Sequence, residues 1–330
     1  MTPSSYTPAY FPDEFAAARD LLKKAQRIVI FSHRGPDGDT VGANLALRRV
    51  LTKQWGKEVR SVCVDAPPRS SSFLPDFDSY LSELDLSWPD LLVSVDCGSS
   101  AMIAFGSTTP TLFDGSIPFI NLDHHPSNDE FGTVNIVDAK AAAACQILYR
   151  FFVFCEAKID RQIATALLHG LYYDTGSFMH SNTNPDVLQI ASELLWKGAD
   201  FKTIVKNQFH TMPVPQLRVY GCILERAHVN DKGVTVSTLN QDDFDSIGAT
   251  ADDTTGAIDY LNSIPDGKVA CLLYENRKGE LKGSLRTRRD DINLSKLAGL
   301  LGGGGHAKAS GFSMPGHLSM DDDQIRITRD

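Results

Sequence analysis

The chain has 330 residues, a formal net charge of −9, a hydrophobic fraction of 42% and a charged fraction of 22%. This composition predicts a folded protein of one large or two medium domains, and the acidic total argues against a protein that coats long DNA by charge alone. No apolar run reaches the roughly 18 residues that cross a bilayer, and the N-terminus lacks the pattern of a secretory signal.

The first two-thirds of the chain alternates short apolar runs with amphipathic ones, a pattern typical of a parallel sheet covered by helices on both faces. We expect strands at 27–32, 59–64, 91–96 and 119–122, and a helix over 40–52 that follows the first strand. Further helices are expected over 141–152, 160–173 and 186–196, the last of them begun by Pro185.

The remainder of the chain predicts a second, smaller α/β unit. The stretch 198–228 has helical patterning broken by Pro213 and Pro215, and we interpret it as a helical connection. Strands are expected at 234–239, 268–275 and 280–287, and a helix over 293–300 that ends at a run of four glycines, 302–305. The predicted domains are therefore 1–197 and 229–330, joined by the linker 198–228.

Acidic and histidine side chains occur at four places where an element ends. They are His33, Asp37 and Asp39 after the first strand, Asp96 at the end of the third, Asp123, His124 and His125 after the fourth, and Asp174 after the helix 160–173. The carboxyl ends of parallel strands share one edge of a sheet, where binding sites form. A single aspartate at such a point more often caps a helix or forms a turn, but four clusters together predict a metal site.

The ligand types indicate which metal. Carboxylate and imidazole groups suit manganese and, to varying degree, magnesium, iron or zinc, while the lack of thiolates disfavours a structural zinc site. The four carboxylates of Asp37, Asp39, Asp96 and Asp174 would repel one another strongly around a single divalent ion, so two ions about 3.5–4 Å apart are expected. Such pairs catalyse phosphoryl displacement, with one carboxylate bridging the ions and a shared water that ionises to become the nucleophile.

These residues resemble the motifs of the DHH family of phosphoesterases. His33-x-x-x-Asp37-x-Asp39, Val95-Asp96 and Asp123-His124-His125-Pro126 are similar to the first three motifs, and Asp174-Thr175-Gly176-Ser177-Phe178 is similar to the fourth. Gly283-Ser284-Leu285-Arg286 and the segment 302–307 resemble the DHH-associated C-terminal domain. The resemblance is greatest to short two-domain bacterial enzymes that act as oligoribonuclease and pAp phosphatase.

The resemblance implies a fold and a division of tasks. The domain 1–197 is expected to be a catalytic α/β domain with a mostly parallel sheet of five strands flanked by helices. The domain 229–330 is expected to be a smaller mixed-sheet α/β domain that binds substrate, with the active-site cleft between the two. Gly35 and Gln146 depart from the family pattern without removing a ligand.

The resemblance also implies residue roles. His33, Asp37 and Asp96 would hold one manganese ion, and Asp39, Asp96, His124 and Asp174 the other, with Asp96 bridging the two. Magnesium and cobalt are alternatives to manganese. Among the groups assigned to catalysis, His125 would face the substrate phosphate and Asp123 would orient a histidine, as imidazoles at metal sites require.

The second domain is predicted to bind the substrate phosphate. The residues assigned to this task are Arg286, Arg288, Gly303, Gly304, Gly305 and His306. Arginine holds phosphate through a two-pronged fork, glycine can offer backbone N–H groups to an anion, and histidine can donate to phosphate or stack on a base. A glycine run alone is more often a helix stop, but the neighbouring arginines and His306 favour a substrate site.

We therefore expect a manganese-dependent phosphoesterase that hydrolyses short oligoribonucleotides to mononucleotides, and pAp to AMP and phosphate. Alternatives in the same class are a pApA or cyclic di-AMP phosphodiesterase, a RecJ-like single-strand exonuclease and a family II inorganic pyrophosphatase. A nucleotide-binding sensor without catalysis is the alternative from another class. The six cysteines form no C-x-x-C pair, which predicts reduced thiols in the cytoplasm, and the sequence is compatible with a homodimer.

Overall fold

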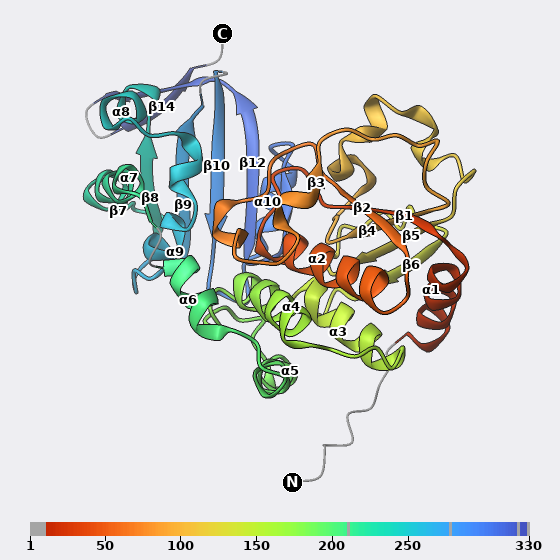
Figure 1. Ribbon diagram of the computed structural model, residues 1–330. Helices are drawn as coiled ribbons and strands as arrows, with labels where there is room; N and C mark the ends of the chain where they lie inside the picture. Colours follow the sequence, from red (N-terminus) through yellow and green to blue (C-terminus); the bar gives the residue numbers. More distant parts are fainter. Residues whose placement is uncertain (1–10, 210–211, 277–278, 322–323, 329–330) are drawn as a thin grey trace. The chain divides into compact units, whose positions relative to one another are not determined.

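The computed structural model describes residues 11–209, 212–276, 279–321 and 324–328 (Figure 1). The chain divides into two compact units, Met1–Thr211 and Met212–Asp330. The division lies within the stretch 198–228 that the sequence marks as a helical connection. One helix on each side of it, α6 (Phe201–Phe209) and α7 (Val214–Glu225), accounts for the helical patterning, and Pro213 is the N-cap of α7.

The first unit is built on one sheet of six parallel strands in the order β3-β2-β1-β4-β5-β6 (Figure 1). The strands are β1 (Arg27–Phe31), β2 (Glu58–Val62), β3 (Tyr80–Leu81), β4 (Leu91–Val95), β5 (Phe119–Asp123) and β6 (Val134–Val137). The sheet has one strand more than the five that the resemblance implies. The apolar runs predict four strands and miss β3 and β6, because a two-residue edge strand and a half-buried strand carry weak apolar signals. The chain returns from β3 to place β4 beside β1, so the strand order reverses between β1 and β4, the place where open sheets bind ligands.

Successive side chains of β1 alternate between the two faces of this sheet. Ile28 and Ile30 belong to a core with helices α2, α3 and α4, whereas Val29 and Phe31 belong to a second core beneath the segment between β4 and β5. Figure 1 shows α2, α3 and α4 side by side along one face. The helices are α1 (Pro12–Lys24), α2 (Gly38–Lys53), α3 (Ala144–Phe154), α4 (Arg161–Asp174) and α5 (Pro185–Trp196), with 3-10 turns η1 (Arg69–Ser71), η2 (Phe77–Ser79), η3 (Ser100–Ile103), η4 (Phe105–Ser107) and η5 (Pro110–Phe113).

The second unit contains a mixed sheet in the order β11-β12-β10-β9-β8-β7, in which β8 and β9 are parallel and the other neighbours antiparallel. The strands are β7 (His228–Val229), β8 (Val234–Leu239), β9 (Val269–Glu275), β10 (Glu280–Arg286), β11 (Gly304–Gly305) and β12 (Ala309–Pro315), beside a hairpin of β13 (His317–Asp321) and β14 (Gln324–Thr328). Its helices are α7, α8 (Gln241–Ile247), η6 (Ala251–Thr254), α9 (Ala257–Asn262) and α10 (Leu294–Gly299). The expected mixed-sheet α/β unit is confirmed. No helix among the described residues is long and apolar enough to cross a membrane.

Candidate metal centre

The four clusters of acids and histidines meet at the carboxyl edge of the first sheet. His33 follows β1, Asp96 follows β4, and His124 and His125 directly follow Asp123, the last residue of β5. The other side chains come from the ends of two packed helices, since α2 begins beside Asp37 and α4 ends at Asp174. Asp37 caps α2 by accepting hydrogen bonds from the backbone N–H groups of Asp39 and Thr40, at 2.9 and 3.1 Å.

His33, Asp37 and Asp96 form one group of potential ligands. The Nε2 atom of His33 lies 3.8 Å from Oδ1 of Asp37 and 3.6 Å from Oδ2 of Asp96. The opposite ring nitrogen, Nδ1, donates to the carbonyl of Arg34 at 2.8 Å. This bond favours the tautomer in which Nε2 is unprotonated and able to bind a metal ion.

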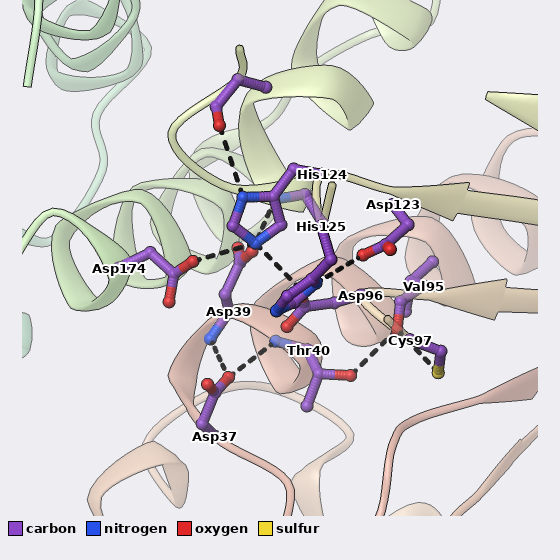
Figure 2. A network of polar contacts seen from close by, with 12 residues as sticks. Asp37, Asp39, Thr40, Val95, Asp96, Cys97, Asp123, His124, His125 and Asp174 are labelled. Carbon is purple, nitrogen blue, oxygen red and sulfur yellow. Dashed lines mark hydrogen bonds and ion pairs between the residues drawn. The ribbon is translucent and has the colours of Figure 1, made fainter. Parts of the chain in front are cut away.

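His124 is the centre of a second group (Figure 2). Its Nε2 atom lies 3.2 Å from Oδ1 of Asp96 and 3.2 Å from Oδ2 of Asp174, and its Nδ1 lies 3.3 Å from the carbonyl of Ala141. Ligand atoms of Asp39, Asp96 and His124 all lie within 4.8 Å of one another. The structure therefore brings together the two sets of side chains that the sequence nominates, and Asp96 belongs to both.

Asp96 carries the features expected of a residue between two cations. Its side chain is 2% exposed, and its buried Oδ1 atom faces the ring nitrogens of His124 at 3.2 Å and of His125 at 3.7 Å. Its backbone is left-handed, with φ at 59°, a conformation that costs free energy outside glycine and is often kept at functional sites. Several carboxylates buried this close together cost free energy unless cations or protons neutralise their charge, so these residues fit divalent metal ions.

The electrostatics of the group point the same way. Burial, together with the charges of Asp96 and Asp174, raises the pKa of Asp39 well above its usual value, and burial raises the pKa of Asp174 to about 6. Burial opposes ionisation of Asp96 as well, but hydrogen bonds from His124 and His33 hold its pKa below the usual value. Without bound cations this cluster retains protons, and bound cations would displace them.

His125 is held beside the potential ligands and differs from them in its partner. Its Nδ1 lies 2.8 Å from Oδ1 of Asp123 and 3.7 Å from Oδ1 of Asp96 (Figure 2). Burial lowers the pKa of His125, but the Asp123 carboxylate outweighs it and raises the pKa above the usual value. Gly98 permits this placement, because a Cβ there would lie 3.2–3.3 Å from Cγ and Cβ of His125.

The predicted phosphate-binding residues lie at one end of the second unit's sheet. Arg286 is the last residue of β10 and pairs with Ala309 of β12, which β11 (Gly304–Gly305) also joins. Its Nε lies 3.6 Å from Oδ1 of Asp259, and Arg288 donates to the carbonyl of Ile264 at 2.9 Å.

The glycine run of this unit departs from the prediction at one point. The N–H of Gly303 donates to the carbonyl of Ala298 at 2.9 Å and so closes α10. His306 donates its backbone N–H to the carbonyl of Ala309 at 2.8 Å. Gly303, which the sequence predicts to bind phosphate, thus uses its backbone N–H inside the unit, because the end of a helix needs donors for its last carbonyls.

Several groups that position the ligands are absent from the sequence prediction. Helix α3 has no side-chain cap at Ala143, and Asp39 of α2 accepts the N–H groups of Ala144 and Cys145 instead, at 2.6 and 3.1 Å. Gln146, one of the departures from the family pattern, accepts the N–H of Ala142 at 2.6 Å. A helix that begins on alanines without a cap residue is the signal that a distant acceptor supplies the cap.

The chain is similar to known proteins over most of its length. The DHH family, N-terminal domain, matches residues 27–171, and the DHHA1 domain matches residues 231–325. The bifunctional oligoribonuclease and PAP phosphatase NrnA of Thermus thermophilus is 30% identical over 325 residues, which cover 97% of this chain and 94% of that protein. The probable bifunctional oligoribonuclease and PAP phosphatase NrnA of Streptococcus mutans is 27% identical, over 88% of this chain and 90% of that protein.

A solved structure resembles this chain closely. The exopolyphosphatase-related protein from Bacteroides fragilis has a TM-score of 0.85 and 24% sequence identity, and the match covers 96% of this chain and 94% of that chain. This likeness confirms the two-unit fold. The strands and helices that carry His33, Asp96 and Asp174 thus belong to an arrangement already observed in a crystal.

Proposed function

The chain belongs to the DHH family of phosphoesterases, and we propose that it hydrolyses short oligoribonucleotides to mononucleotides and pAp to AMP and phosphate. The family membership makes it a hydrolase of phosphoesters. The observation that carries the proposal is the pair of ligand groups that share the buried carboxylate of Asp96. The names of the relatives from Thermus thermophilus and Streptococcus mutans support the choice of substrates.

We assign two divalent cations to the site, with manganese as the preferred metal. His33, Asp37 and Asp96 would hold one, and Asp39, Asp96, His124 and Asp174 the other. When bound, such a pair polarises the phosphate and lowers the pKa of the water that attacks it.

The side chains of the protein hold the remaining groups in place. Arg34 and Ala141 accept from the Nδ1 atoms of the two ligand histidines and so direct each Nε2 inward. His125, held by Asp123, would donate to a phosphoryl oxygen and stabilise the charge that develops there.

The second unit is proposed to bind the other end of the substrate. Arg286 and Arg288 carry guanidinium groups near the end of β10. Strand β11 consists of two glycines, so no side chain blocks access to its backbone. A short nucleotide with a terminal phosphate fits such a division of tasks better than a long polyanion, given the net charge of −9. All six cysteines are free thiols, and the reducing cytoplasm is the proposed location.

A substrate panel tests the proposal. The 330-residue chain with manganese is incubated with RNAs of two to five nucleotides, pAp, pApA, cyclic di-AMP and pyrophosphate. We expect hydrolysis of the short RNAs and of pAp. Turnover of cyclic di-AMP or pyrophosphate in preference to both would overturn the substrate assignment, and manganese binding without any turnover would indicate a nucleotide sensor.

A further inference from the structure

A chain of hydrogen bonds reaches His125 from outside the two ligand groups. Asp123 uses one carboxylate oxygen, Oδ1, to accept from Nδ1 of His125 at 2.8 Å. Its other oxygen, Oδ2, accepts from the amide nitrogen of Asn128 at 2.7 Å. Asp123 is fully buried, so both of its oxygens depend on protein donors for the solvation that water would otherwise supply.

The contacts of Asn128 fix which way its amide points. Its Oδ1 accepts from the side-chain nitrogen of Asn121 and from the backbone N–H of Glu130, both at 2.8 Å. Its Nδ2 donates to Asp123 and to the carbonyl of Cys97, the latter at 3.0 Å. With a longer bond from Nδ2 to Oδ1 of Asn121 at 3.5 Å, these contacts satisfy the whole amide. A carboxylate of the same shape has no proton to donate to Asp123 or Cys97.

Asn128 therefore connects two strand ends that the site needs in register. Cys97 directly follows Asp96, whose left-handed backbone turns the end of β4, and Asp123 ends β5. Gly98, one residue further, lies against the ring of His125. The same amide thus holds the turn behind one face of the His125 ring and the carboxylate that bonds its Nδ1.

We infer that Asn128 is a positioning residue for phosphoester hydrolysis and acts through Asp123 on His125. It keeps the Asp123 carboxylate aligned with Nδ1 of His125, so that the ring carries its proton there and is held in one orientation. This inference rests on the proposed function, in which His125 donates to the phosphate. The alternative is that Asn128 only stabilises the turn 125–130, in which its backbone N–H donates to the carbonyl of His125 at 3.1 Å. In that case its side chain would have no specific effect on catalysis through the His125 ring.

A kinetic double-mutant cycle separates the two roles. The enzymes compared are wild type, Asn128→Ala, His125→Ala and the double variant, each with saturating manganese, on pAp and on a trinucleotide RNA. We expect Asn128→Ala to lower kcat by about 10–100-fold with little change in KM. In the His125→Ala background the same substitution should change kcat by less than about twofold, since the residue it acts through is absent. Equal losses in both backgrounds, or no loss in either single variant, would overturn the inference.

Two further variants sharpen the comparison. Asn128→Asp keeps the shape but sets a second carboxylate against Asp123, so it should be at least as slow as Asn128→Ala. Asn135→Ala alters the same polar cluster through Asn121 but makes no bond to Asp123, and it should keep wild-type kcat. An Asn135→Ala enzyme as slow as Asn128→Ala would show that the cluster matters only for folding.

A spectroscopic readout makes the result independent of turnover. In nitrogen–proton correlation spectra of the imidazoles at alkaline pH, the His125 signal is identified by its loss in His125→Ala. We expect the Nδ1–H tautomer in the wild type and a mixture of tautomers in Asn128→Ala. An unchanged tautomer would refute the positioning role. If the wild type hydrolyses none of the substrates, the proposed function fails, yet this spectrum still decides what Asn128 does.

Discussion

Gly170 lets helix α4 approach Asp39, a proposed metal ligand, more closely than any other residue would allow. A Cβ built at this position lies 2.4 Å from Sγ of Cys145, 2.5 Å from Oδ1 of Asp39 and 2.9 Å from Cα of Asp39. Because one of these atoms is backbone, rotation of a side chain cannot relieve the overlap. Overpacking of this kind costs about 1–3 kcal/mol, while alanine gains about 1 kcal/mol over glycine in a helix.

For Gly170→Ala we therefore expect a net loss of about 1 kcal/mol, and at most about 2 kcal/mol, in the free energy of unfolding of the first unit. The shift of Asp39 should also weaken manganese binding by about tenfold or more. All three tryptophans, Trp55, Trp88 and Trp196, lie in the first unit, so tryptophan fluorescence during urea unfolding of the full chain reports on this unit.

Gly221 of α7 provides the control. A Cβ at this helical position meets no atom within 4 Å, so Gly221→Ala should stabilise the second unit by up to about 1 kcal/mol, as followed by circular dichroism. The two substitutions exchange the same residue types in a helix and differ in the space around them. If Gly170→Ala also stabilised the protein and left manganese binding unchanged, the reasoning from close approach would be refuted.

Three other expectations follow from the first unit. Burial lowers the pKa values of His33 and His124, but neighbouring carboxylates outweigh burial and raise both pKa values well above normal. Manganese affinity, measured by calorimetry, should therefore rise with pH as the two histidines lose their protons. A manganese affinity that does not change with pH would contradict this expectation. Burial lowers the pKa of His169 from 6.5 to about 4. The free energy of unfolding should therefore fall by about 3 kcal/mol as the pH drops through this range. In urea titrations of His169→Gln, the free energy of unfolding should depend less on pH over the same range. Arg150→Met removes a guanidinium from a side chain that is 6% exposed and should lower the free energy of unfolding by about 3–5 kcal/mol in denaturant titrations. Arg161→Met, at a side chain that is 69% exposed, should lower it by under about 1 kcal/mol. Equal losses would show that burial of the ion pair is unimportant.

The parts of the fold that the sequence predicts are those with strong local patterns. The run at β1 is almost wholly buried and apolar, so periodicity and length identify it without tertiary information. Asp37 follows it in a Gly/Pro loop, where a helix cap and a metal ligand demand the same residue type. The edge strand β3 has only two residues, and its pairing depends on β2 rather than on its own sequence.

The parts that sequence patterns missed depend on contacts between distant segments. Helix α3 begins at Ala144 rather than at 141, because the preceding alanines form the turn whose carbonyl at Ala141 receives His124. Asn128 resembles any loop asparagine until the turn at the end of β4 is seen beside it. The amide of Gly303 closes α10, a role set by helix geometry and invisible in a run of glycines.

The most direct test of the account is the hydrolysis of pAp and of a trinucleotide RNA by Asp96→Asn at saturating manganese. Asp96 is the one carboxylate common to both ligand groups, and asparagine keeps its shape while removing its charge. The account predicts a loss on the order of a thousandfold relative to wild type, while the exposed control Asp114→Asn keeps full activity. An Asp96→Asn enzyme that retains most of the wild-type rate would contradict the assignment of this site to catalysis.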